Sequence, residues 1–126
     1  MKDPAILEAA YNDALGITAA FNLNILNHLN RRVGSDFTVS GWRHQAGFNA
    51  ALGRIEMHLA ARGEQTVCWP GGRRTFAAGE RIHTENSYKY DPDGFGQMLG
   101  ESGFEPVRCW TDPARWFAVF LARVAA

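Results

Sequence analysis

The segment Arg54-Ile55-Glu56-Met57-His58-Leu59 alternates polar and apolar residues. Successive side chains of a β-strand point to opposite faces, so this alternation predicts a strand. Its apolar members, Ile55, Met57 and Leu59, then lie on one buried face. The sequence therefore predicts that this strand contributes to the core of the fold.

Further strand signals follow this segment along the chain. Residues 65–69 and 73–77 flank Pro70-Gly71-Gly72, a turn sequence that predicts a hairpin. Residues 81–87 predict another strand. Together these segments predict a small antiparallel meander.

The first third of the chain predicts helices that pack on the meander. Asp3-Pro4 supplies an N-cap and a first-turn proline for a helix that reaches about Asn12. Gly16 interrupts the pattern, Thr18 is placed to cap a second helix, and Gly34 ends it. The second helix has an apolar stripe at helical spacing: Phe21, Ile25, Leu26, Leu29 and Val33. A shorter helix is expected from about residue 39 to 51.

Four asparagines are unusual in the second helix, because asparagine is a poor helix former. They are Asn22, Asn24, Asn27 and Asn30. One interpretation is a solvated helix face. The other is that some of these amides contact a ligand or a partner domain.

The last third has a different organisation. Asp91-Pro92 predicts a helix to about Ser102, followed by a strand over residues 104–111, a turn at 112–114 and a final strand over residues 116–123. The final strand is almost continuously apolar, as expected of a strand covered on both faces. This chain can cover one face, so we expect a partner chain or self-association through the final strand.

Composition excludes several function classes. Thirteen basic and thirteen acidic residues cancel, so no net field favours nucleic acid or an anionic membrane. The chain shows no signal peptide and no apolar run of membrane-spanning length, and we expect a cytoplasmic protein. Cys68 and Cys109 are expected to be buried apolar residues, with a disulfide as the less favoured alternative. The four histidines lack ligand spacing, so no metal site is predicted.

The clearest candidate site is Thr84-Glu85-Asn86-Ser87-Tyr88-Lys89-Tyr90. In an extended chain, Glu85 and Ser87 point to the same face, about 7 Å apart. A carboxylate and a hydroxyl side by side suit an imidazole, which offers an N–H at one ring nitrogen and a lone pair or a second N–H at the other. The alternative is a polar strand end with a solvated carboxylate.

Six blocks of sequence, in order and at close to constant spacing, point to one protein family. They are Ala10-Tyr11-Asn12-Asp13, residues 16–24, Arg54-Ile55-Glu56-Met57-His58-Leu59, Phe76-Ala77-Ala78-Gly79-Glu80, Thr84-Glu85-Asn86-Ser87 and Trp110-Thr111-Asp112-Pro113. With these blocks the chain resembles the C-terminal portion of the histidine-specific, S-adenosylmethionine-dependent methyltransferases of ergothioneine biosynthesis. Those enzymes trimethylate the α-amine of histidine. This chain covers less than half of the family's length.

The resemblance implies an α+β fold in two parts. Residues 1–90 would form part of a substrate-binding domain, with helices packed on a small antiparallel sheet. Residues 91–126 would form the helix–strand–strand ending of a Rossmann-like class I methyltransferase sheet, in which the last strand enters antiparallel.

The resemblance also implies roles for four residues. Tyr11 would hold the substrate carboxylate, Met57 would line the pocket, and Glu85 and Ser87 would hold the imidazole of histidine. These roles are specificity and orientation, and no residue of the chain is expected to act as a nucleophile or a proton-transfer group.

S-Adenosylmethionine is the cofactor that the family implies. Adenosyl cofactors sit over a Gly-rich strand-to-helix turn. The nearest match, Asp93-Gly94-Phe95-Gly96, lacks the further glycine and reads as a helix start. No cofactor is therefore expected to bind this chain alone.

Three functions remain open at this point. The chain is a truncated histidine Nα-methyltransferase that is inactive without its cofactor-binding half, or a subunit of a split enzyme. The third option, of a different class, is a stand-alone module that binds histidine or a related small molecule without catalysis.

Overall fold

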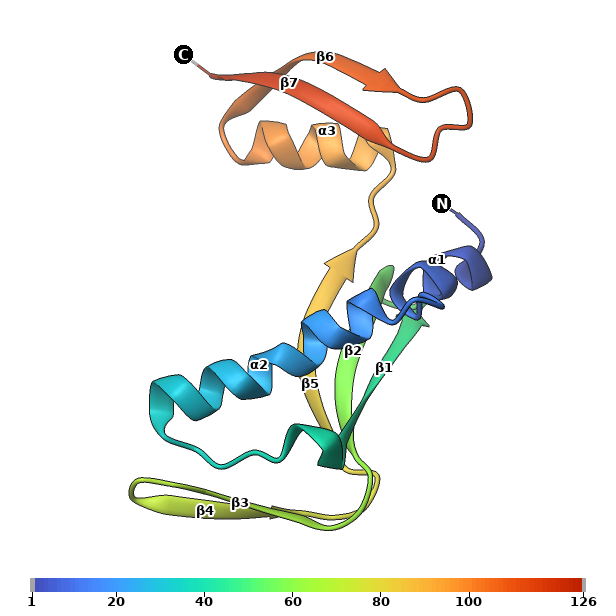
Figure 1. Ribbon diagram of the computed structural model, residues 1–126. Coiled ribbons are helices and arrows are strands. Elements are labelled where there is room, and N and C mark those ends of the chain that lie inside the picture. Colours follow the sequence, from blue (N-terminus) through green and yellow to red (C-terminus); the bar gives the residue numbers. More distant parts are fainter. Residues whose placement is uncertain (1, 126) are drawn as a thin grey trace. The chain divides into compact units, whose positions relative to one another are not determined.

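The computed structural model describes residues 2–125 and has an α+β fold (Figure 1). The chain forms two compact units, one over Asp3–Tyr88 and the other containing the described residues from Lys89 onward. The first unit contains α-helices and paired strands, and the second contains one α-helix and one pair of strands. None of the described helices is both long enough and apolar enough to cross a bilayer.

A three-stranded antiparallel sheet organises the first unit. Its order is β1 (Trp42–Asn49), β2 (Arg54–Ala61) and β5 (Arg81–Tyr88). A hairpin of β3 (Gln65–Trp69) and β4 (Gly72–Phe76) forms a separate two-stranded sheet. The predicted strands are therefore confirmed, but they do not make one continuous meander. The hairpin is an excursion, and β5 returns to pair directly with β2.

The predicted helix over residues 39–51 is wrong. A short 3-10 turn, Val39–Gly41, leads directly into β1. Every residue of β1 pairs with β2, from Trp42 opposite Ala61 to Asn49 opposite Arg54. Strand preference depends on the pairing partner, which a local reading of the sequence does not include.

Both N-terminal helices have defined caps. Helix α1 (Pro4–Tyr11) begins with the Asp3 carboxylate accepting the Ala5 N–H at 2.8 Å. Helix α2 (Ile17–Val33) ends at Gly34, whose φ of 67° is left-handed. The predicted Thr18 cap is wrong, because Thr18 lies inside the first turn. The Asp13 carboxylate accepts the N–H groups of Ile17 and Thr18 instead, at 2.9 and 2.8 Å.

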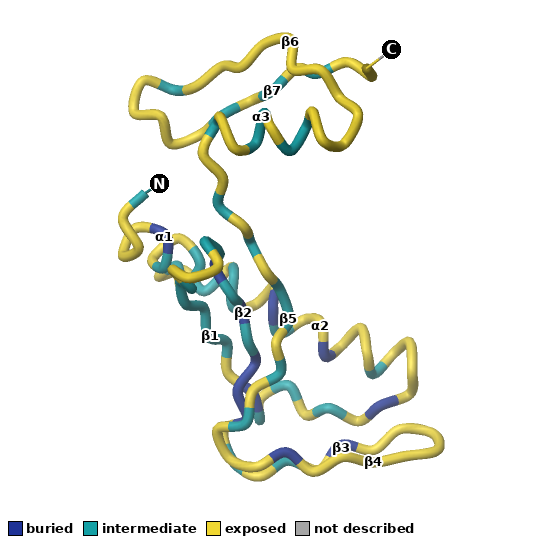
Figure 2. Tube along the Cα trace, turned by 180° about the vertical axis from the view of Figure 1, so that it is seen from behind, coloured by how far each residue is buried: buried dark blue, intermediate teal, exposed yellow. Residues whose placement is uncertain are grey.

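The buried residues concentrate on β2 (Figure 2). Ile55, Met57 and Leu59 are at most 1% exposed, which confirms the face predicted for this strand. Leu59 belongs to a cluster with Leu26, Trp42, Ala61, Val67 and Phe76. Ile55 and Met57 form a second cluster with Leu7. Helix α1 thus covers the end of the sheet that carries Met57.

Helix α2 does not bury its predicted apolar stripe. Of the five stripe residues Leu26 is buried, whereas Phe21 is 67% exposed. Buried Asn22 takes a place on the inner face, and its Nδ2 lies 3.2 Å from His58 O. Asn30 donates from Nδ2 to Phe37 O and accepts the Phe37 N–H. For these two asparagines the solvated-face interpretation is wrong, because their amides hold the chain itself.

The second unit contains α3 (Pro92–Glu101), β6 (Phe104–Thr111) and β7 (Ala118–Val124). The Asp91 carboxylate caps α3 by accepting the Gly94 N–H at 2.9 Å. Strands β6 and β7 pair antiparallel. Strand β7 begins two residues later than predicted, because the Asp112 carboxylate accepts the N–H groups of Trp116 and Phe117 in the connecting loop.

The two faces of β7 differ within this unit. The Phe120 ring packs on Phe95 of α3, with ring centroids 4.9 Å apart. Val119 and Leu121, on the opposite face, are 49% and 51% exposed. Helix α3 therefore covers one face of the strand, and apolar side chains lie open on the other.

Both cysteines are exposed free thiols, so their predicted burial is wrong. On β3 the side chain of Val67 is buried, and Cys68, the next residue, points outward. The alternation of the strand places the thiol on the solvent face.

Candidate functional site

Three elements of the first unit bring the four predicted site residues to one face of the sheet. Met57 of β2 pairs with Glu85 of β5, and Ile55 pairs with Ser87. Side chains of directly opposed residues lie on the same face, with Cβ atoms about 5 Å apart. Glu85 and Ser87 therefore share the face of buried Met57, as the spacing of the sequence predicts.

Tyr11 reaches this face from the end of α1. Its phenol oxygen lies 2.6 Å from Ser87 Oγ, with either atom able to donate. Its ring packs against the cluster that contains Met57. The end of α1 is held to β1, because His44 Nε2 lies 2.8 Å from Tyr11 O and Asn12 Nδ2 donates to Ala46 O.

Glu85 opens onto a cavity between α2 and β5. The cavity has a volume of about 190 Å³. Its wall contains apolar groups of Phe21 and Ile25 together with polar groups of Asn24 and His28; Asn22, Thr84 and Glu85 complete the lining. A mostly apolar wall with a few polar groups is typical of small-molecule sites. The sequence raised Asn24 as a possible ligand contact, but it gave no sign of His28, which reaches this cavity only through the packing of α2.

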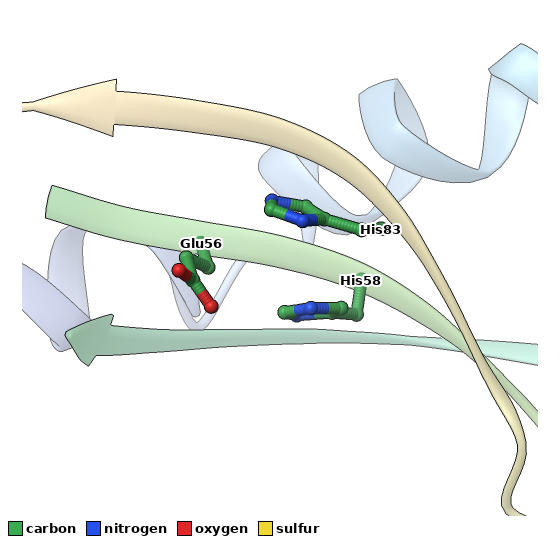
Figure 3. A group of neighbouring side chains, drawn as sticks. All are labelled: Glu56, His58 and His83. Atoms are coloured by element: carbon green, nitrogen blue, oxygen red, sulfur yellow. The ribbon is translucent and has the colours of Figure 1, made fainter. Parts of the chain in front are cut away.

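The opposite face of the same sheet carries a second polar cluster (Figure 3). Glu56 and His58 project from β2, and His83 projects from β5, directly opposite His58. The two imidazole rings stack with centroids 4.6 Å apart and an interplanar angle of 28°. One potential ligand atom from each of the three side chains lies within 4.8 Å of the other two. Sequence spacing missed this cluster because it is formed by strand register.

The electrostatics of this cluster follow from its neighbours. Partial burial lowers the pKa of His58, and the charges of His83 and Arg81 act in the same direction. The hydrogen bond from the Arg54 guanidinium lowers the pKa of Glu56, and that pair is 2.6 Å apart. At neutral pH the cluster therefore contains a neutral His58 imidazole and an ionised Glu56 carboxylate.

Comparison with known proteins identifies the family of the chain. The family model of histidine-specific, SAM-dependent methyltransferases matches residues 1–124. The chain belongs to this methyltransferase family. The resemblance drawn from the six sequence blocks is thereby confirmed.

The chain is similar to three characterised relatives over most of its length. The histidine N-alpha-methyltransferase of Mycolicibacterium smegmatis is 42% identical over 97% of this chain, and that of Mycobacterium tuberculosis is 43% identical over the same share. Ergothioneine biosynthesis protein 1 of Neurospora crassa is 31% identical over 86% of the chain. The chain spans 39% of each mycobacterial relative and 12% of the Neurospora protein.

The described residues contain no Gly-rich strand-to-helix turn of the kind on which adenosyl cofactors lie. The strand pairings among residues 2–125 are all antiparallel, and Gly94 and Gly96 lie within α3 instead of in a strand-to-helix turn. The Gly94 N–H, which a phosphate or carboxylate could otherwise use, is taken by Asp91. No step of the reaction is therefore assigned to a cofactor held by these residues.

Proposed function

We propose that this chain is the C-terminal, substrate-recognition part of an S-adenosylmethionine-dependent L-histidine Nα-methyltransferase of ergothioneine biosynthesis, acting in the cytoplasm. The observation that carries the proposal is the convergence of Tyr11, Met57, Glu85 and Ser87 on one face of the β2–β5 pair. We propose that the methyl donor is bound by the remainder of the protein and that the chain alone is inactive. The division into a substrate part, 1–90, and a methyltransferase-sheet part, 91–126, belongs to the same proposal.

The four side chains have complementary roles in this proposal. Glu85 accepts a hydrogen bond from one imidazole N–H of the substrate, and Ser87 bonds the other ring nitrogen. Met57 is 1% exposed and packs with Leu7 and Ile55 on the same face, so it would support the site from within the core. Tyr11, bonded to Ser87 at 2.6 Å, stands at the end of the site where the substrate carboxylate would bind.

This arrangement favours histidine over other amino acids of similar size. A ligand without ring nitrogens would leave the partly buried Glu85 carboxylate without its substrate partner. Leaving such a group unpaired costs about 1–3 kcal/mol. Selectivity of this kind exceeds what an apolar pocket achieves from shape alone.

A chimera tests the proposal. This chain would replace the matching segment of the Mycolicibacterium smegmatis relative, and methylation of histidine would be measured with labelled methyl donor. We expect activity in the chimera and none in the isolated chain. Glu85→Ala should lower kcat/KM at least tenfold, because a charge-assisted hydrogen bond is worth about 1.5–3 kcal/mol. Ser87→Ala should lower kcat/KM less, because the neutral hydrogen bond that it removes is worth about 0.5–1.5 kcal/mol.

Glu64→Ala is the matched control, since Glu64 is an exposed carboxylate outside the site. It should leave kcat/KM unchanged. If kcat/KM were unchanged in Glu85→Ala, Glu85 would not bind the imidazole of the substrate. Methyl transfer by the isolated chain would overturn its proposed dependence on a cofactor-binding half.

A further inference from the structure

The polar face of the β2–β5 pair carries an arrangement that the methyltransferase proposal does not use. We propose that Glu56, His58 and His83 bind a divalent transition-metal ion, with Zn²⁺ as the best-suited member. Two imidazoles and one carboxylate form a ligand set that zinc accepts, with a fourth position left for water. Imidazole ligands also favour Zn²⁺, Cu²⁺ or Ni²⁺ over Mg²⁺ and Ca²⁺.

The strand register places the three ligands. His58 and His83 are directly opposed across the two strands, and Glu56 lies two residues before His58 on the same face. The potential ligand atoms lie within 4.8 Å of one another. Zinc–ligand bonds of about 2.0–2.2 Å put tetrahedral ligand atoms about 3.3 Å apart. The two stacked rings would therefore tilt toward a common point when the ion binds.

The surroundings of the two histidines suit metal binding. His83 Nε2 lies 3.1 Å from the carbonyl oxygen of Glu85, so Nε2 is the donor, and in the neutral tautomer Nδ1 is the nitrogen that can bind an ion. A backbone carbonyl on the second ring nitrogen is the usual support of a metal-binding histidine. Among the described residues, neither ring nitrogen of His58 has a hydrogen-bond partner. Partial burial favours its neutral, ligating form.

The Glu56 carboxylate already bonds the Arg54 guanidinium, and a second guanidinium, that of Arg81, lies near the site. The hydrogen bonds from Arg54 and Asn49 within the described chain all fall on Glu56 Oε1, so Oε2 is the oxygen directed to a metal. Arg81 also lies near His58 and opposes a bound cation. Because these two guanidinium groups repel a cation, we expect zinc to bind here more weakly than at a closed structural zinc site.

An ion bound at this position would link strands β2 and β5. The β2–β5 register shifts between Met57 and His58, and the Thr84 hydroxyl donates to Met57 O at this irregularity. A metal held by His58 and His83 would join the two strands at that point. The opposite face there carries Met57 and Glu85, so the ion would stiffen the floor of the proposed histidine site without touching it.

Zinc titration of the purified 126-residue chain tests the proposal. The reference protein carries Cys68→Ser and Cys109→Ser, because both exposed thiols could otherwise bind the ion. After treatment with a chelator, calorimetry should show one Zn²⁺ per chain. His83→Gln and His58→Gln should each weaken binding at least tenfold, whereas His28→Gln, in the exposed turn of α2, should not change it. Zinc should raise the Tm of the reference protein and leave that of His83→Gln unchanged.

A second measurement does not depend on the folding of a variant. In NMR spectra of the reference protein, Zn²⁺ should shift the imidazole signals of His58 and His83 and leave those of His28 in place. Absence of saturable binding, or equal affinity in His83→Gln and His28→Gln, would overturn the proposal. So would zinc-induced shifts confined to histidines other than His58 and His83.

Discussion

The phenol oxygen of Tyr11 lies 2.6 Å from the hydroxyl oxygen of Ser87, although 76 positions separate the two residues in the chain. This bond joins the end of α1 to the last strand of the sheet. It holds two of the four proposed substrate contacts together in the protein itself. The site is therefore organised by tertiary structure before any ligand arrives, which lowers the entropic cost of binding.

The energetic weight of this bond can be measured with a double-mutant cycle. Tyr11→Phe and Ser87→Ala should each lower the free energy of unfolding by about 0.5–1.5 kcal/mol, the usual contribution of one hydrogen bond. The double variant should lose little more than either single variant, because both remove the same interaction. Urea unfolding measures all four proteins, and losses that simply add would show that the two hydroxyls are energetically independent.

Met57 is predicted to contribute to stability as well as to the site. It is 1% exposed and packs with Leu7 and Ile55. Met57→Ala should lower the free energy of unfolding by about 2–5 kcal/mol, because it leaves a cavity in the core. Leu15→Ala is the control, since Leu15 is 85% exposed, and it should change stability by less than about 0.5 kcal/mol. A loss of equal size in both variants would contradict the packing of Met57.

Much of the candidate site could be predicted from sequence because its information is local. The alternation at residues 54–59 fixes the face of Met57, and two-residue spacing puts Glu85 and Ser87 on one face. Tyr11 came from the family resemblance alone. Its approach to Ser87 depends on how α1 packs on the sheet, which no local pattern states.

Three of the features that the sequence misjudged or missed depend on a partner far along the chain. Strand β1 exists because β2 pairs with it along its whole length. Asn22 is buried because His58 O accepts its amide, whereas a helical reading expected Phe21 inside. The pairing of His58 with His83 depends on the register of two strands separated by the β3–β4 hairpin.

Asp13 should make the start of α2 sensitive to acid. The N–H groups of Thr18 and Ile17 bond its carboxylate and lower its pKa below the ordinary value. A lowered pKa in the folded state stabilises the fold above the unfolded-state pKa, and that stabilisation is lost as the pH falls through the folded-state value. Asp13→Asn should therefore reduce the loss of stability between neutral pH and about pH 3.

Urea unfolding at the two pH values measures this effect. Asn at position 13 can still accept from the helix N–H groups, so the variant should fold. Glu64→Gln serves as the control for removing one exposed carboxylate. If Asp13→Asn and the unmodified chain lost the same stability in acid, protonation of Asp13 would not be coupled to unfolding.

The open face of β7 should make the isolated chain associate with itself. Val119 and Leu121 lie half exposed beside each other on the face that α3 does not cover. Exposed apolar strand faces of this kind drive association in the absence of a covering layer. Leu121→Lys should therefore shift the chain from larger species to monomer in size-exclusion chromatography. Val33→Lys, which places the same charge at an exposed position of α2, should leave the elution unchanged.

Hydrogen exchange decides between this prediction and a self-sufficient domain. If β7 requires a partner sheet, amides of β6 and β7 should exchange faster in the Leu121→Lys monomer than those of β2 and β5, which are covered by α1 and α2. In the unmodified, associated chain the β7 amides should be slower than in the variant. A monomeric unmodified chain whose β7 amides are among its slowest would contradict the need for a partner and favour a stand-alone binding module. The exchange experiment thus tests the proposed incompleteness of the methyltransferase sheet directly, without any assay of activity.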